Sequence, residues 1–187
     1  LLVLEITVPE VPASTPTAVV QELVFEQWNE FLGYALSFLV IGLYWTLHRR
    51  IFVHIETHDR GVLWLNLLFL LFVAFVPYAT SVFSRYPGQF GVSFIAGVLA
   101  LTGVSLAFLW IYASRKQLLE QGLTSRVVEI QAARFLATPM VFSASIAVAA
   151  VDSTWGVVSW LLLVPINGAL NSRLVASFEE EPGGTGS

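Results

Sequence analysis

The chain has 187 residues, of which 56% are hydrophobic and only 12% charged, and its mean hydropathy is +0.76. A soluble domain of this length could not bury so much apolar surface in one core, so the composition predicts a membrane protein. The formal net charge of −4 says little, because the placement of charges matters more than their sum in such a protein. The sequence has no cysteine, which excludes disulfides, thiolate metal sites and cysteine catalysis.

The first residues have the character of the last turns of an apolar helix. Five of residues 1–7 are apolar, and we expect this segment to end a first membrane span that begins further upstream. Residues 8–16 are rich in proline and predict a loop, with Thr15 as a helix cap and Pro16 at the first helical position. From there the helical pattern continues to about Phe52.

Five further segments are uncharged and approach the length of about 20 residues that a membrane span needs. They cover residues 31–47 (extending to 52), 61–83, 86–114, 135–151 and 155–172. With the partial span at the start, they predict an all-α polytopic membrane protein with six transmembrane helices per subunit, the first one truncated. The transmembrane domain is expected over 1–175, with an amphipathic surface linker at 115–134 and a disordered cytoplasmic tail at 176–187.

The basic residues predict the orientation. Six spans place both termini on one side of the membrane, together with eight of the nine Lys and Arg residues. These are Arg49, Arg50, Arg60, Arg115, Lys116, Arg126, Arg134 and Arg173, and Arg85 falls on the other side. Because basic residues gather in cytoplasmic loops, we expect both termini in the cytoplasm. The external side is then acidic, and its acidic residues either concentrate cations or merely solubilise the loops.

Polar residues inside spans are functional candidates, because they are costly to place in lipid. His48 lies near the end of the first complete span, and Asn66 lies one turn into the next. A short turn joins the two spans, so these side chains are placed to face each other near the inner leaflet. One interpretation is a buried network that holds a pore helix. The other is an interfacial aromatic belt with a histidine that caps a helix.

Other chemistry has little support in the sequence. His54 and His58 have the spacing of a metal-binding pair, but no further ligand is evident, and a solvated turn is the favoured interpretation. No histidine lies deep enough in a span to hold haem. Phosphate-binding, hydrolase and zinc-protease motifs are absent, as is the Thr-Val-Gly-Tyr-Gly potassium filter. We therefore expect no enzyme, no cofactor and no nucleic-acid partner.

Three motifs stand in order in the first half of the chain. They are Leu-Leu-Val-Leu-Glu-Ile-x-Val-Pro at 1–9, Tyr-Ala-Leu-Ser-Phe-Leu-Val-Ile-Gly-Leu-Tyr-Trp-x-x-His at 34–48, and Leu-Trp-Leu-Asn-Leu-Leu-Phe-Leu-Leu at 63–71, followed by Phe-Val-Pro-Tyr at 75–78. Together they resemble bacterial members of the transmembrane protein 175 family, six-span potassium channels related to the lysosomal potassium channel of animals. The resemblance is dense over residues 1–86 and rests mainly on span layout over 87–187.

The resemblance implies a homotetramer in a bacterial plasma membrane, with a central potassium pore lined by the first span of each subunit. The family's pore motif, Ile-x-x-x-Leu-x-x-Leu, follows an Arg-x-x-x-Phe-Ser-Asp signature. Its two leucines match Leu1 and Leu4, and the rest would lie upstream. Four copies would give stacked apolar rings, which can gate by dewetting. Trp45 and His48 match positions that anchor the pore helix, and Asn66 is a further expected member of that network.

A potassium-selective channel, with the lipid bilayer and permeant K⁺ as partners, is therefore the leading functional prediction. A secondary transporter is the alternative, although the sequence shows neither an inverted repeat nor a carboxylate deep within a span. A membrane-embedded enzyme would need a nucleophile with a base, or deep metal ligands, and neither is visible.

Overall fold

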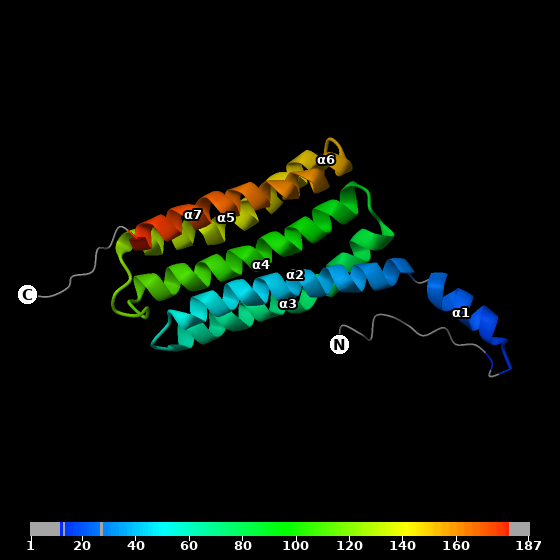
Figure 1. The fold of residues 1–187 in the computed structure, drawn as a ribbon, viewed down its shortest axis with the longest axis horizontal. Helices are drawn as coiled ribbons and strands as arrows, with labels where there is room; N and C mark the ends of the chain where they lie inside the picture. The colour runs from blue at the N-terminus through cyan, green and yellow to red at the C-terminus, as the bar shows by residue number, and fades with distance from the viewer. Residues whose placement is uncertain (1–11, 13, 27, 180–187) are drawn as a thin grey trace, which may run out of the picture.

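The computed structural model describes residues 12, 14–26 and 28–179, and this part of the chain is a bundle of helices (Figure 1). In chain order they are α1 (Thr17–Glu26), α2 (Trp28–Val53), α3 (Arg60–Arg85), α4 (Gln89–Arg115), α5 (Ser125–Ala149), α6 (Ser153–Val158), the 3₁₀ helix η2 (Ser159–Leu162) and α7 (Leu163–Glu179). An isolated bridge between Ile55 and Leu119 joins two of the connecting loops. The all-α prediction is confirmed.

Five stretches of the described chain are long and apolar enough to cross a membrane. They are Phe31–Val53, Arg60–Arg85, Gln89–Arg115, Ser125–Ala149 and Ser153–Arg173. Each overlaps one of the five complete spans predicted from the sequence, so the chain is a multi-pass membrane protein. The partial first span and most of the predicted tail lie outside the described residues.

The predicted surface linker at 115–134 is longer than the connection that the structure contains. Residues 125–134 are instead the first turns of α5. The indole Nε1 of Trp110 donates a hydrogen bond to the carbonyl of Val128, at 3.1 Å, which ties the start of α5 to α4. Buried residues spaced by four form a stripe along the start of α5, namely Val127, Gln131 and Phe135. This buried face continues through a segment in which many of the other residues are polar. The span formed by α5 therefore begins about ten residues before the uncharged segment at 135–151.

The helical pattern predicted from Pro16 to Phe52 corresponds to two helices, α1 and α2, on either side of Gln27, which lies outside the described residues. α1 starts at Thr17, one residue later than predicted. The carbonyl of Pro16 accepts the amide of Val20 at 3.3 Å, so Pro16 occupies the cap position rather than the first helical one.

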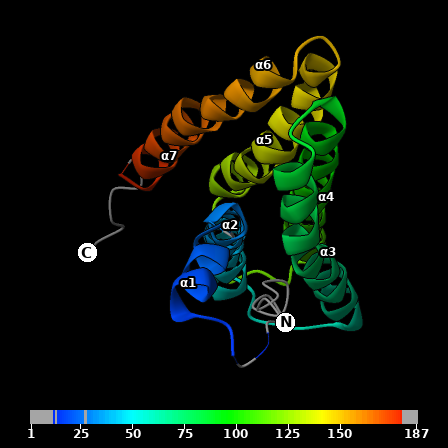
Figure 2. The same cartoon turned by 90° about the vertical axis from the view of Figure 1, so that its right-hand side faces the viewer.

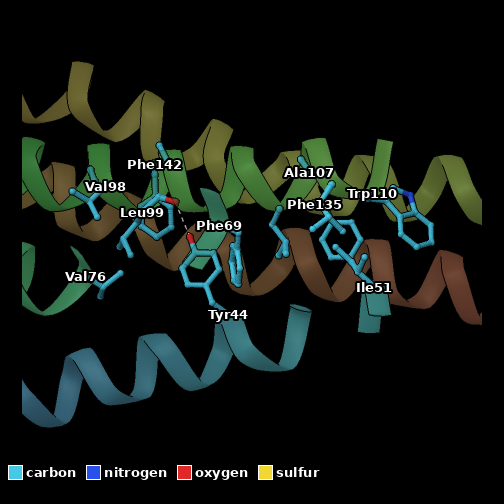
Figure 3. Close-up of a cluster of buried hydrophobic side chains, with 14 of the residues drawn as sticks. Tyr44, Ile51, Phe69, Val76, Val98, Leu99, Ala107, Trp110, Phe135 and Phe142 are labelled. Carbon is cyan, nitrogen blue, oxygen red and sulfur yellow. Dashed lines mark hydrogen bonds between the residues drawn. The ribbon is translucent and has the colours of Figure 1, made fainter. Parts of the chain in front are cut away.

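The core is built around α4, which packs against both α3 and α5. Its most apolar stretch is 67% buried inside the subunit. Phe69 from α3 and Phe135 from α5 bury their rings near Trp110 and Leu99 of α4 (Figure 3). Gly103 lets α5 approach closely, because a Cβ atom added there would lie 2.9 Å from Cδ of Pro139. Small residues serve this purpose at helix contacts in membranes.

The remaining helices lie at the edges of this core. α2 packs beside α3, while α7 packs on α5, and Figure 2 shows α2 and α7 as separate flanks of the bundle. Only 11% of the apolar stretch of α2 is buried, and 6% of the last span. The two flanking spans therefore present most of their apolar surface to whatever surrounds the subunit.

Candidate functional site

His48 of α2 and Asn66 of α3 are in direct contact. Nε2 of the imidazole lies 2.7 Å from the side-chain oxygen of the amide. An amide oxygen can only accept, so Nε2 carries a hydrogen and donates it, and in the neutral ring Nδ1 is left as an acceptor. Both side chains are half-buried. The contact expected from the short turn between the two spans is therefore present.

Aromatic rings fix the orientation of this imidazole. The His48 ring stacks on Phe69 with 5.1 Å between centroids and 8° between planes. The ring centroid of Phe52, one turn further along α2, lies 4.4 Å from that of His48. Since Phe69 itself is fully buried in the core, the histidine is held against a rigid surface and not merely by one hydrogen bond.

The ring of Trp45 also packs on His48. The two rings stack with 5.7 Å between centroids and 22° between planes, and the tryptophan is 61% exposed. Because the indole of Trp45 is exposed and is oriented by stacking on the half-buried ring of His48, it presents an ordered apolar surface. That surface is accessible to a further helix or to lipid.

Tyr44 is a member of this region that the sequence analysis did not single out. Its hydroxyl donates a 2.7 Å hydrogen bond to the carbonyl of Leu99, and the ring is buried (Figure 3). Tyr44 lies four residues before His48, on the same face of α2. α2 is thus held to α3 through His48 and to α4 through Tyr44. The four-residue spacing was the available signal, but a backbone acceptor leaves no mark in the sequence.

The pair considered as metal ligands is engaged elsewhere. Nδ1 of His54 lies 2.6 Å from a carboxylate oxygen of Glu120, in the loop after α4. The His58 ring stacks on Phe52 at 5.8 Å. Among the side chains that the structure describes, no group of three or more His, Cys, Asp or Glu could hold a metal.

Asp59 joins the start of α3 to the end of α4. One carboxylate oxygen accepts the amide of Val62 at 2.8 Å, and the other accepts the hydroxyl of Tyr112 at 2.7 Å. The bond from Val62, and then that from Tyr112, lowers the pKa of Asp59 below its ordinary value. Together with the Glu120 contact, these bonds tie the two loops at one end of the bundle.

Leu1 and Leu4, the residues predicted to form the pore constriction, lie outside the described residues. Their role stays a prediction, as do the anchoring roles of Trp45, His48 and Asn66. What the structure adds is that these three side chains form one connected group.

Comparison with known proteins places this group in a recognisable segment. Residues 1–77 match the family model described as the endosomal/lysosomal potassium channel TMEM175. A protein of Streptomyces collinus named as a potassium channel is 36% identical over 120 residues, which cover 62% of this chain and 57% of that protein. The Homo sapiens endosomal/lysosomal proton channel TMEM175 is 42% identical over 60 residues, which cover 30% of this chain and 12% of that protein.

A solved structure has the same fold. The crystal structure of a lysosomal potassium-selective channel TMEM175 homolog from Chamaesiphon minutus superimposes with a TM-score of 0.66 and 23% identity. The superposition covers 91% of this chain and 88% of that one. The likeness therefore extends beyond residue 77, into the part of the chain where the sequence motifs are weak.

Proposed function

Because this chain is a relative of the transmembrane protein 175 family, we propose that it is a potassium-selective channel of a bacterial plasma membrane, with both termini in the cytoplasm. One observation carries the proposal. The segment that matches the family, residues 1–77, contains Leu1, Leu4 and the whole contact between Trp45, His48 and Asn66. The Streptomyces collinus protein, one of the bacterial relatives of this chain, is named as a potassium channel.

In the proposed assembly four subunits surround a central pore lined by their first spans. Leu1 and Leu4 are three residues apart, which puts them on one face of a helix. Four copies would stack two apolar rings, and a constriction of that kind closes when it loses its water. Neither ring supplies an oxygen to replace the hydration shell of K⁺, so selectivity would have to arise from the width and length of the constriction.

The group around His48 supports the first span in this proposal. Its Nε2 is committed to Asn66, so Nδ1 is the ring atom that can accept a hydrogen bond from a further helix. No residue among those described donates to Nδ1. The stacked indole of Trp45 adds an ordered apolar surface beside it. A hydrogen-bond acceptor beside an apolar ring is better suited to contact with a helix that carries a donor than to contact with lipid chains.

The test is a reversal potential measured on the full gene product in planar bilayers, under opposed potassium and sodium gradients. A shift towards the potassium equilibrium potential is the expected result. Absence of current from folded oligomers, with substrate-coupled flux instead, would overturn the proposal in favour of a secondary transporter.

Proton permeation is a second candidate, because the human relative is named as a proton channel. The same bilayers, with symmetrical potassium and a gradient of one pH unit, separate the two ions. A reversal potential that follows the proton gradient would assign proton conduction. One that stays at zero would restrict the channel to metal cations.

A further inference from the structure

A pocket of about 350 Å³ lies between α2 on one side and α4, α5 and α7 on the other. It does not include the His48 group. Val40, Leu43, Phe142 and Leu163 contribute apolar walls, and Leu43 is 67% exposed at its rim. The flanking helices that enclose it, α2 and α7, are the separate edges seen in Figure 2.

The pocket changes character along its length. On α2, Val40 and Leu43 are followed by Arg50, in the last turn of the helix. On α5, which runs the opposite way, Arg134 precedes Thr138 and Phe142. Both arginines therefore lie towards the end of the bundle where α2 finishes and α5 begins. That end is the one expected to face the cytoplasm, so the walls pass from cationic at the interface to apolar deeper in the membrane.

The two guanidinium groups lack a counter-charge among the described residues. Arg134 donates from Nη1 to the neutral amide oxygen of Asn171, at 3.2 Å, and its Nε is buried with no acceptor. Arg50 lines the same pocket from the facing helix. Two like charges across a partly buried space repel, and a buried donor without an acceptor is unfavourable. An anion between the two arginines would relieve both.

We propose that this pocket binds one anionic phospholipid of the cytoplasmic leaflet. The phosphate lies between Arg50 and Arg134, and an acyl chain follows Leu43 towards Phe142. Arginine suits this role because its planar fork matches phosphate oxygens, and basic pockets between spans on the cytoplasmic side are suited to lipid headgroups. A free phosphate would satisfy the arginines but leave the apolar walls uncovered. This inference goes beyond ion conduction and does not depend on which ion permeates.

Native mass spectrometry of the full gene product, released from vesicles of equal parts phosphatidylglycerol and phosphatidylcholine, tests the proposal. We expect phosphatidylglycerol to be retained preferentially by the wild-type protein. The double variant Arg50→Gln/Arg134→Gln should retain it about 25-fold less well, since each arginine near the surface contributes about a five-fold factor. Arg49→Gln/Arg173→Gln is the matched control, because it removes the same charge from two positions on that side that do not line the pocket.

A second variant keeps the test decisive if the first one misfolds. Leu43→Trp fills the apolar part and leaves both arginines in place, so it should also reduce retention, while Arg50→Lys/Arg134→Lys should recover part of it. Circular dichroism and size exclusion verify the fold of each variant. Equal retention in the double variant and its control would overturn the proposal. So would equal retention of the two lipids, displacement by millimolar inorganic phosphate, or crosslinks that place a second copy of the chain on Leu43.

Discussion

The spans formed by α4 and α2 are both apolar enough to cross a membrane but are held in place by different means. α4 has 67% of its most apolar stretch buried inside the subunit, whereas α2 has 11%. α4 is surrounded by closely approaching helices, as at Gly103. α2 is attached at separate polar points, through Tyr44 and His48, and leaves its apolar face open. In lipid, hydrophobicity does not drive two apolar helices together, so close packing and hydrogen bonds decide which one is central.

The largest expected effect is at the α4–α5 contact. Gly103→Ala places a methyl group against the rigid ring of Pro139, and we expect it to destabilise the fold by about 1–3 kcal/mol. Gly97→Ala in the same helix is the control, because nothing lies within 4 Å of a Cβ atom there. It should leave stability unchanged or raise it by up to about 1 kcal/mol, through better helix propensity. Thermal unfolding in detergent measures both, and equal midpoints would show that α4 is not closely packed at Gly103.

The next effect concerns the attachment of α2 to α3. His48→Ala removes the hydrogen bond to Asn66 and a ring that packs on Phe69, and should cost about 1–2 kcal/mol. Under the proposed function, His48→Ala and Trp45→Ala should each also weaken oligomer assembly or current. A double-mutant cycle with Asn66→Ala should give a coupling energy of about 0.6–1.7 kcal/mol. Wild-type assembly and flux in both single variants would remove His48 and Trp45 from any supporting role.

A smaller effect is expected at the attachment of α2 to α4. Tyr44→Phe keeps the buried ring and deletes only the donor to the Leu99 carbonyl, so it should cost about 1 kcal/mol. Tyr78→Phe is a suitable control, because that tyrosine is 53% exposed. If the two variants unfold at the same temperature, the hydrogen bond does not secure α2.

The smallest effect is a pH dependence at the tied loops. The pKa of Asp59 is lowered in the folded protein, so its contribution is fully present above the unfolded pKa of about 3.9 and is lost as the pH falls through the folded value. We therefore expect the unfolding temperature to fall with pH below about 4. Tyr112→Phe removes one of the bonds that lower this pKa and should make that part of the profile shallower. An unchanged profile would mean that the bond does not stabilise the ionised carboxylate.

The sequence predicted the spans well because length and lack of charge are sufficient to locate them. It misplaced the start of α5, since polar residues at the membrane boundary look like a linker even when one buried stripe continues through them. The contact between His48 and Asn66 was predictable from a short turn between antiparallel helices. The bond from Tyr44 was not, because its acceptor is a backbone carbonyl. Nor was it predictable that Arg50 and Arg134 line the same pocket. These residues are far apart in the chain, and a basic residue near the end of a span indicates only its orientation in the membrane.

The contacts that hold α2 to the core differ along its length. Polar contacts through Tyr44 and His48, and through His54 in the following loop, hold its second half. Nearer its start, α2 is packed closely on α3, because Ser37 is buried and a Cβ atom added at Gly33 would lie 3.1 Å from Oγ of Ser84. α2 therefore relies on hydrogen bonds to the core at one end of the membrane and on close packing of small residues nearer the other.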